Sequence, residues 1–379
     1  MIKRKSILSM ILALALTLSL LGGCGPKDSE GSSSADDTVY EATLVVQETA
    51  EDDRIAKAAE AEVRRLYEAS NGRLKITISP NASGVSSASD IYDSVRSGLV
   101  EMGMQSSSRV AGYFPLTDVL TLPGGVSYPG ATQMGVVACA LYEQVPEIQQ
   151  EFDGVKVLSF NSTAATMLYS IENVVNKPGD FAGKLIRGGG TYGLEAIEAL
   201  GASAVTLAPG EWADGAVKGV YDINVSNYAS NVTFAMSDLF NYAYDYTIQT
   251  SYFVYIVNED FYNSLPTDLQ ELLSWENMGY DSAALYGGVC DEMEDTLSSV
   301  FFDNGGQIIE PSEADIAELD ATLEVVKESW LKTASELVGE TRAQEILDLY
   351  YDLCVEYADY EFDYQSVLDE GLALPEVGT

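Results

Sequence analysis

Arg187 is the residue whose type and position in the sequence are best suited to chemistry. It ends the run Leu185-Ile186-Arg187, which we expect to be a strand, and it precedes Gly188-Gly189-Gly190 and a helical pattern. In open α/β sheets, ligands bind at the carboxyl ends of strands. A guanidinium offers a planar fork of donors that matches a carboxylate bidentately, and it stays charged. Arg187 is therefore a candidate for binding an acidic group, although a surface arginine paired with one of the chain's many acids is the ordinary interpretation.

The segment from Pro178 to Asn227 must position this arginine. Its pattern reads strand, turn, helix, strand, turn, helix, strand, with the second strand at 204–207 and the third around 218–222. That alternation predicts an α/β fold in which helices cover a parallel sheet. The 379 residues allow two such domains, and a hydrophobic content of 46% is sufficient for packed cores.

This segment resembles the solute-binding subunits of TRAP transporters (tripartite ATP-independent periplasmic, dicarboxylate-type). The resemblance covers roughly residues 40–330, and it extends to the runs Asn71-Gly72-Arg73-Leu74 and Gly154-Val155-Lys156-Val157-Leu158. Within the central segment, the residues that match the family pattern in order and spacing are Pro178, Asp180, Phe181, Gly183, Arg187, Leu200-Gly201-Ala202, Glu211-Trp212 and Gly219-Val220-Tyr221-Asp222.

The resemblance implies a two-lobed, periplasmic-binding-protein-like (type II) α/β fold with a long helix that spans both lobes. We expect lobe I to comprise residues 38–162 plus about 252–290, and lobe II about 163–251 plus 291–379. The implied function is that of an extracytoplasmic receptor, not an enzyme. It would capture a small organic acid in the cleft between the lobes, close by hinge motion, and deliver the acid to integral-membrane TRAP permease subunits.

In the family, the arginine that matches Arg187 grips the carboxylate of the solute. The family often uses a second arginine shortly after the strand that here ends at Phe160, but this sequence continues Asn161-Ser162-Thr163 without one. A dicarboxylate held by two arginines is therefore in doubt, and a monocarboxylate or a sugar acid is as good a candidate. Asn161, Ser162 and Thr163 either donate hydrogen bonds to the ligand or form an ordinary turn at the strand end.

Further candidates for the cleft come from the segments that follow. We expect one of Asn224, Ser226 and Asn227 to line it, with Asn224 and Ser226 on one face of a strand. Trp212 packs either under the ligand or into the core. Tyr246 belongs to an aromatic run that could stack on a ring or a sugar face, although half-buried strand aromatics are the commoner explanation.

Composition excludes several classes of function. The formal net charge is −39, which argues against nucleic acid or an anionic membrane surface as a partner. Histidine is absent, so a histidine base, a histidine metal ligand and a Ser-His-Asp triad are excluded. No phosphate-binding, dinucleotide or calcium motif is present, and we expect neither a cofactor nor a metal. The acidic pairs Asp52-Asp53 and Glu292/Asp295 are interpreted as solvated faces.

The first residues have the pattern of a targeting signal. Basic residues Lys3, Arg4 and Lys5 precede an apolar stretch at 7–21, which is too short to span a membrane, and Leu21-Gly22-Gly23-Cys24 resembles a bacterial lipobox. We therefore expect a signal peptide at 1–23, a lipid on Cys24 and a disordered tether at 24–37. This predicts a protein on the extracytoplasmic face of the bacterial cell membrane, held there only by that lipid.

Two further expectations concern the second half of the chain and the cysteines. Residues 267–303 and 312–361 have nearly unbroken helical patterns. Cys139, Cys290 and Cys354 have no CxxC spacing, and three buried thiols are favoured over one disulfide with one free thiol.

Two rival functions remain open from the sequence. One is the binding lipoprotein of an ATP-driven importer, or a ligand sensor, for a sugar or a sugar acid. The other is a surface hydrolase that uses paired carboxylates, for which no motif is present. The sequence gives neither the ligand nor the identity of any second cationic contact.

Overall fold

The computed structural model of the chain describes residues 38–123 and 130–370. The predicted signal peptide, the lipidation residue Cys24 and the tether lie outside these residues, so the lipoprotein prediction stays a prediction. Within the described part, no helix is both long and apolar enough to cross a membrane. The described residues contain two β-sheets, which we use to define the lobes: lobe I carries the first sheet and lobe II the second.

The sheet of lobe I has the strand order β2-β1-β3-β10-β4. Strands β1, β2 and β3 are parallel, whereas β10 runs antiparallel to both β3 and β4. The strand β10 reaches lobe I from a stretch of chain that belongs to lobe II, so it is one of the crossing connections. The bounds of the strands are β1 Tyr40–Val45, β2 Leu74–Ser79, β3 Met102–Ser106, β4 Val155–Ser162 and β10 Tyr252–Asn258.

The sheet of lobe II has the order β11-β9-β5-β8-β6-β7. Its parallel trio β8, β6 and β7, with the helices α5 (Thr191–Ala199) and α6 (Trp212–Val217) between them in the sequence, has the strand–helix alternation that the sequence predicted around Arg187. The third strand lies at 223–226 and not around 218–222 as expected, because the chain turns at Gly219, whose φ is +66°. The bounds of the strands are β5 Met167–Ser170, β6 Leu185–Arg187, β7 Ser203–Val205, β8 Ile223–Ser226, β9 Tyr242–Tyr244 and β11 Gln307–Ile309.

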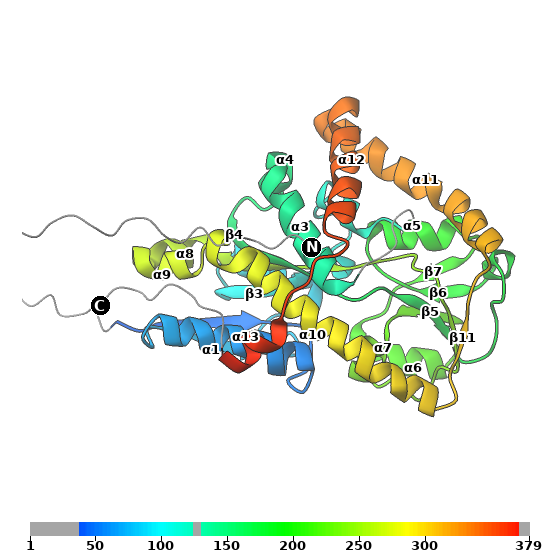
Figure 1. Cartoon of the computed structure of the whole chain (residues 1–379), viewed down its shortest axis with the longest axis horizontal. Helices are drawn as coiled ribbons and strands as arrows, with labels where there is room; N and C mark the ends of the chain where they lie inside the picture. Colours follow the sequence, from blue (N-terminus) through cyan, green and yellow to red (C-terminus); the bar gives the residue numbers. More distant parts are fainter. Residues whose placement is uncertain (1–37, 124–129, 371–379) are drawn as a thin grey trace, which may run out of the picture. The chain divides into compact units, whose positions relative to one another are not determined.

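Helices cover both sheets (Figure 1). Their bounds are α1 Glu60–Ala69, α2 Ile91–Arg96, α3 Ala131–Gln144, α4 Pro146–Gln150, α5 Thr191–Ala199, α6 Trp212–Val217, α7 Tyr228–Thr233, α8 Glu259–Ser264, α9 Thr267–Leu272, α10 Trp275–Asp303, α11 Glu313–Val338, α12 Glu340–Glu356 and α13 Tyr364–Glu370. A π-helical segment, Arg54–Ala59, directly precedes α1. Such segments are rare and are frequent at functional sites.

The helix α10 is the long helix that the family resemblance implied. It packs on β4 and α3 in lobe I and on α7 in lobe II (Figure 1, yellow). It approaches α3 so closely that a Cβ atom at Gly287 would lie 2.5 Å from Cα of Thr132. The helix begins at Trp275, not at Thr267 as expected, because Ser274 has extended backbone angles and separates it from α9.

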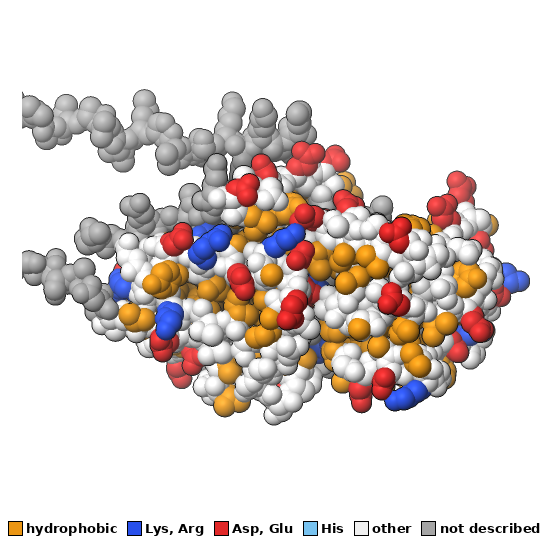
Figure 2. Space-filling view, turned by 90° about the horizontal axis from the view of Figure 1, so that it is seen from below, with side chains coloured by type: hydrophobic (Ala, Val, Ile, Leu, Met, Phe, Trp, Pro, Cys, Tyr) orange, Lys and Arg blue, Asp and Glu red, His pale blue; other side chains and the backbone are white. Residues whose placement is uncertain are grey.

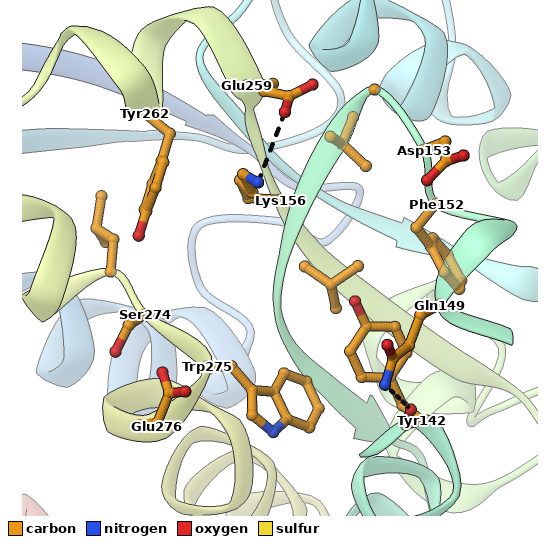
Figure 3. Close-up of a pocket in the computed structure, with 14 residues that line it drawn as sticks. Tyr142, Gln149, Phe152, Asp153, Lys156, Glu259, Tyr262, Ser274, Trp275 and Glu276 are labelled. Carbon is orange, nitrogen blue, oxygen red and sulfur yellow. Dashed lines mark hydrogen bonds and ion pairs between the residues drawn. The ribbon is translucent and has the colours of Figure 1, made fainter. Parts of the chain in front are cut away.

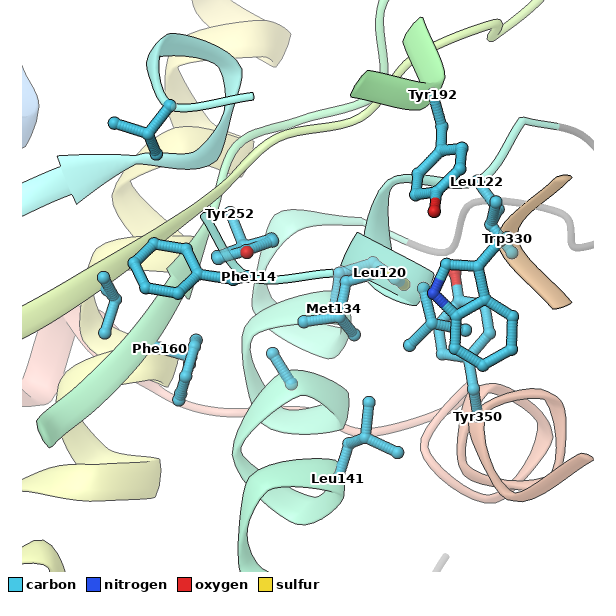
Figure 4. Packing of buried hydrophobic residues seen from close by; sticks show 14 of the residues in the cluster. Phe114, Leu120, Leu122, Met134, Leu141, Phe160, Tyr192, Tyr252, Trp330 and Tyr350 are labelled. Atoms are coloured by element: carbon cyan, nitrogen blue, oxygen red, sulfur yellow. The ribbon is translucent and has the colours of Figure 1, made fainter. Parts of the chain in front are cut away.

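The C-terminal helices contact both lobes. The helix α11 packs on α5, and α12 packs on α3. Trp330 of α11 is fully buried, and its Nε1 donates to the carbonyl oxygen of Pro115 at 2.9 Å. Figure 4 shows its indole packed between Leu122, Tyr192 and Tyr350. The expected continuous helix is divided at Gly339, whose φ of +87° is incompatible with a helix. The predicted lobe boundaries stay a prediction.

Many acidic side chains lie on the surface, whereas the cysteines of the described residues are buried. Acidic side chains are dispersed over the face in Figure 2, where they outnumber the basic ones. Cys139, Cys290 and Cys354 are buried free thiols, as expected.

Candidate functional site

A polar cavity of about 60 Å³ lies between the lobes. It is lined by three arginines, Arg54, Arg109 and Arg187, of which the sequence analysis had selected only the last. Trp212, Phe234 and Phe253 supply its aromatic surface. The remaining lining groups are neutral, and they include Gln47, Ser106, Thr166, Ser226, Gln249 and Ser251.

Arg187 is buried at the carboxyl end of β6. Because β6 and β8 are parallel with Arg187 opposite Asn224, the two side chains meet. The guanidinium Nη1 donates to Oδ1 of Asn224 at 2.9 Å and to the carbonyl oxygen of Val225 at 3.2 Å. The other edge of the guanidinium carries Nε, which is buried and has no hydrogen-bond partner among the described residues. The Nε/Nη2 edge is the geometry that binds a carboxylate bidentately.

The charge of Arg187 is poorly compensated. Burial and then the positive charge of Arg109 lower the pKa of Arg187 to about 9. The group therefore remains protonated at neutral pH, in surroundings that disfavour its charge. Its guanidinium carbon lies 3.8 Å from the centroid of the Trp212 ring, which provides a cation–π contact. An anionic ligand would provide the missing counter-charge.

Arg109 is a second cation that the sequence analysis missed. It belongs to the turn Ser107–Arg109, directly after β3, and its guanidinium carbon lies 4.8 Å from the centroid of the Trp212 ring. Its Nε donates to Oε1 of Gln47 over 3.5 Å. Burial lowers its pKa to about 10, against an opposing effect of Glu48. Its position directly after a strand could have identified Arg109 from the sequence, since the same feature identified Arg187.

Arg54 is already neutralised by Asp52. Its Nε and Nη2 donate to the two carboxylate oxygens at 2.8 and 2.6 Å, and Oγ1 of Thr233 in α7 donates to the same carboxylate at 2.5 Å. The expectation that Asp52 belongs to a solvated face is therefore wrong, because the residue is only 5% exposed. Its neighbour Asp53 does face solvent. Next to this pair lies Glu48, whose pKa is raised by burial.

The structure brings some of the predicted site residues together. Trp212 and Asn227 line the cavity with Arg187. Asn227 also begins α7, where its Oδ1 accepts from the backbone N–H of Ser230 at 2.8 Å. Asn224 is fully buried and holds Arg187 without lining the cavity.

The other predicted residues lie elsewhere. Asn161 and Ser162 are buried in β4 and do not line the cavity, whereas the adjacent Thr163 does. Tyr246 lies outside the lining as well, and its hydroxyl donates to Asp320 of α11 at 2.6 Å. A ligand role for these three residues stays a prediction.

Direct contacts between the lobes lie next to the cavity. The backbone N–H of Gly190, before α5, donates to the carbonyl oxygen of Ser108 at 3.2 Å. Oγ1 of Thr191 accepts from the N–H of Gly112 at 3.0 Å and donates to Oδ2 of Asp118 at 3.3 Å. The conformation is therefore one in which the lobes meet around the arginines.

A larger hollow of about 570 Å³ opens on the surface of lobe I (Figure 3). Its wall carries Tyr142, Tyr262 and Trp275, and its one cationic lining residue among those described, Lys156, is paired with Glu259 at 3.5 Å. Because Asp153 and Glu276 add further negative charge, this hollow is poorly suited to an anion. The cavity between the lobes is the better candidate site.

Comparison with protein families gives a match over residues 45–333 to the model for DctP, bacterial extracellular solute-binding protein, family 7. Comparison with curated proteins gave no match.

Similar solved structures share the fold at low sequence identity. A TRAP solute-binding protein from a marine metagenome, specific for aromatic acids and solved with metahydroxyphenylacetate, has a TM-score of 0.77 and 22% identity, covering 84% of this chain and 99% of its own. One from Rhodoferax ferrireducens with copurified benzoate has a TM-score of 0.78 and 17% identity, covering 85% and 99%. One from Bordetella bronchiseptica with bound mandelate has a TM-score of 0.75 and 22% identity, covering 84% and 99%. These matches confirm the predicted two-lobed α/β fold.

Proposed function

This chain belongs to family 7 of the bacterial extracellular solute-binding proteins, as its sequence pattern predicted, and on that premise we propose that it captures a small organic acid by its carboxylate in the cavity between the lobes. One observation carries the proposal: Arg187 is a buried, charged guanidinium with its Nη1 fixed by Asn224 and its Nε without a partner among the described residues. A carboxylate supplies both the acceptors and the charge that this edge lacks.

The chemistry of the lining favours capture over catalysis. Among the described residues that line the cavity there is no carboxylate, thiol or amine that could serve as nucleophile or general base. The acids bound by the three similar structures, metahydroxyphenylacetate, benzoate and mandelate, each carry one carboxylate, which supports an acidic ligand here.

We further propose that the protein delivers the acid to TRAP-type membrane subunits. The support is the family pattern around Arg187 and the lipobox-like run that ends at Cys24. In this proposal a lipid on Cys24 holds the receptor at the extracytoplasmic face of the membrane. Metabolic labelling with a palmitate analogue, compared between the wild type and Cys24→Ala, tests the anchor. Labelling that persists in Cys24→Ala would contradict it.

A ligand screen tests the binding function. Thermal unfolding of the wild type, Arg187→Ala and the control Arg64→Ala, in which an exposed arginine is removed, is measured with monocarboxylates, dicarboxylates, sugar acids and neutral sugars. An acid at one hundred times its Kd adds about 2.7 kcal/mol to the stability of the folded state. We expect an acid to stabilise the wild type and Arg64→Ala but not Arg187→Ala.

The same screen separates the alternative function. If only neutral sugars raise the melting temperature, and raise it equally in Arg187→Ala, then the carboxylate proposal is wrong. A sugar-binding receptor of an ATP-driven importer, or a sensor, would then be the better interpretation.

A further inference from the structure

We propose that Arg109 is the second arm of the carboxylate clamp, and that the clamp selects monocarboxylates because one carboxylate is shared by Arg109 of lobe I and Arg187 of lobe II. This inference rests on the proposed function, since it concerns the same cavity, and it adds both a binding residue and a narrower class of ligand. The clamp takes the place of the family's second arginine, which is absent after Phe160.

The spacing of the two guanidinium groups supports a shared carboxylate. Their central carbons lie 3.8 Å (Arg187) and 4.8 Å (Arg109) from the centroid of the same ring, that of Trp212. A guanidinium and a carboxylate joined by charged hydrogen bonds have their central carbons roughly 4 Å apart. These distances place the two central carbons at most about 8.6 Å apart, which is close to the roughly 8 Å between two guanidinium carbons that share one carboxylate.

The donors that remain free point to the same pair of arginines. Arg187 uses Nη1 on Asn224, which leaves its Nε/Nη2 edge. Arg109 has only the long contact from Nε to Gln47, so its two terminal nitrogens have no hydrogen bond to any described residue. Arg54 is different, because both oxygens of Asp52 occupy its Nε and Nη2. Two of the three arginines are thus free to bind an anion.

If both free arginines bind the same carboxylate, no cation among the described lining residues remains for a second carboxylate of the ligand. The pair Arg54–Asp52 is neutral, and the free positive charges are those of Arg109 and Arg187. A second carboxylate on the ligand would then meet only neutral lining groups, and the buried acid Glu48 lies close enough to Arg54 to interact with its charge. An unpaired carboxylate in such a place loses its hydration without compensation. The rest of the ligand is therefore uncharged, and Phe234 and Phe253 provide apolar surface for it.

Isothermal titration with matched pairs of acids tests the selectivity. The pairs are benzoate with isophthalate and propanoate with succinate, so that each dicarboxylate differs from its partner by one added carboxylate. We expect at least one monocarboxylate to bind the wild type, about tenfold or more tighter than its matched dicarboxylate. A dicarboxylate that binds as tightly as its partner, or more tightly, would overturn the proposal.

Substitution of Arg109 tests the second arm. The variants are Arg109→Gln, Arg109→Lys and the control Arg64→Gln, which removes a charge from an exposed position. We expect Arg109→Gln to weaken monocarboxylate binding about 30-fold, and Arg109→Lys to recover only part of the loss because an ammonium lacks the planar fork. Arg64→Gln should bind as the wild type does.

The outcomes distinguish this inference from the proposed function. If Arg187→Ala abolishes binding while Arg109→Gln keeps the wild-type Kd, Arg109 is not an arm of the clamp but the proposed function stands. If no acid binds the wild type, both fail. Melting temperatures of the unliganded variants report whether they fold. Should Arg109→Gln not fold, Arg109→Lys decides, since an unchanged Kd for that variant also excludes the shared clamp.

Discussion

Arg187 and Asn224 lie opposite each other on the parallel strands β6 and β8, and a 2.9 Å hydrogen bond from Nη1 of the arginine to Oδ1 of the asparagine joins them. The register of the sheet thus fixes the orientation of the guanidinium. The side-chain oxygen of Asn224 accepts from one edge of the guanidinium, and Nε on the other edge has no hydrogen-bond partner among the described residues. In the proposed function, Asn224 is therefore a positioning residue although it does not line the cavity.

We expect Asn224→Ala to weaken the binding of an organic acid although Arg187 and its charge remain. A buried hydrogen bond to a charged group contributes about 1.5–3 kcal/mol, which corresponds to a loss of affinity of at least about tenfold. Isothermal titration against the wild type measures this loss. Asn173→Ala, which removes an exposed asparagine of the same lobe, is the control. A Kd within twofold of the wild type for Asn224→Ala would show that the hydrogen bond does not orient the arginine.

Gly189 provides a test of lobe closure that leaves the ligand contacts intact. A Cβ atom at this position would lie 2.7 Å from the carbonyl oxygen of Ser108 in the other lobe, which is too close. We therefore expect Gly189→Ala to fold normally but to oppose the closed form, lowering acid affinity about tenfold or more. Small-angle X-ray scattering should show less compaction on ligand addition than in the wild type.

Gly179→Ala is the matched control for closure, because a Cβ atom there would meet no atom within 4 Å. If Gly189→Ala closes and binds as this control does, then the backbone near Ser108 can shift to accommodate a Cβ atom, and the close approach of Gly189 to Ser108 is not required for closure.

Much of the fold follows from local sequence patterns. The apolar periodicity and turns around Arg187 predicted the order of the parallel strands and helices that flank it, although the third strand begins later than expected. The breaks in the long helical patterns were harder to predict. Gly339 ends α11 with a φ of +87°, and Ser274 separates α9 from α10, because packing at those points outweighs helical propensity.

The candidate site was less predictable than the fold, because its members come from distant segments. Asp52 and Arg54 look like part of a solvated acidic run, and only the packing of Thr233 from α7 buries their ion pair. Arg109 follows a strand, as Arg187 does, but the sequence alone did not show that its strand ends at the cleft. Asn161 and Ser162 also follow a plausible pattern, yet β4 continues through them and keeps them inside the sheet.

The ion pair of Asp52 and Arg54 should be important for stability. We expect Asp52→Asn to lower the free energy of unfolding by about 3 kcal/mol, because a buried guanidinium loses its counter-charge. The adjacent Asp53→Asn is the control, since Asp53 is half exposed and its pair with Lys57 is worth under about 1 kcal/mol. Urea denaturation at pH 7 measures both. Equal destabilisation by the two substitutions would contradict the role given to the buried pair.

Because of the same ion pair, we expect the free energy of unfolding to depend on pH. Burial raises the pKa of Asp52, but the charge and hydrogen bonds of Arg54 outweigh burial, so the pKa lies below that of a free carboxyl. A depressed pKa stabilises the folded state above about pH 4 and the contribution is lost as the pH falls further. The difference in unfolding free energy between the wild type and Asp52→Asn should therefore shrink below about pH 4. A difference that is constant from pH 7 to pH 3 would rule this linkage out.

For Asp118 we expect the opposite effect of pH on the stability of the folded state. Its carboxylate accepts from Oη of Tyr252 at 3.1 Å and from Oγ1 of Thr191 in the other lobe, and burial raises its pKa to about 7. Between about pH 4 and pH 7 the folded state therefore holds a proton that the unfolded state has released. The contribution of Asp118 to stability falls as the pH rises through this window and is constant above it.

We expect Asp118→Asn, whose amide resembles the protonated carboxyl, to match the wild type near pH 5 and to exceed its free energy of unfolding by about 2 kcal/mol at pH 8. Urea denaturation at the two pH values measures the change. Asp352→Asn, at an exposed position on α12, is the control for the removal of a surface carboxylate. A difference between Asp118→Asn and the wild type that is the same at pH 5 and pH 8 would mean that Asp118 does not titrate in this range.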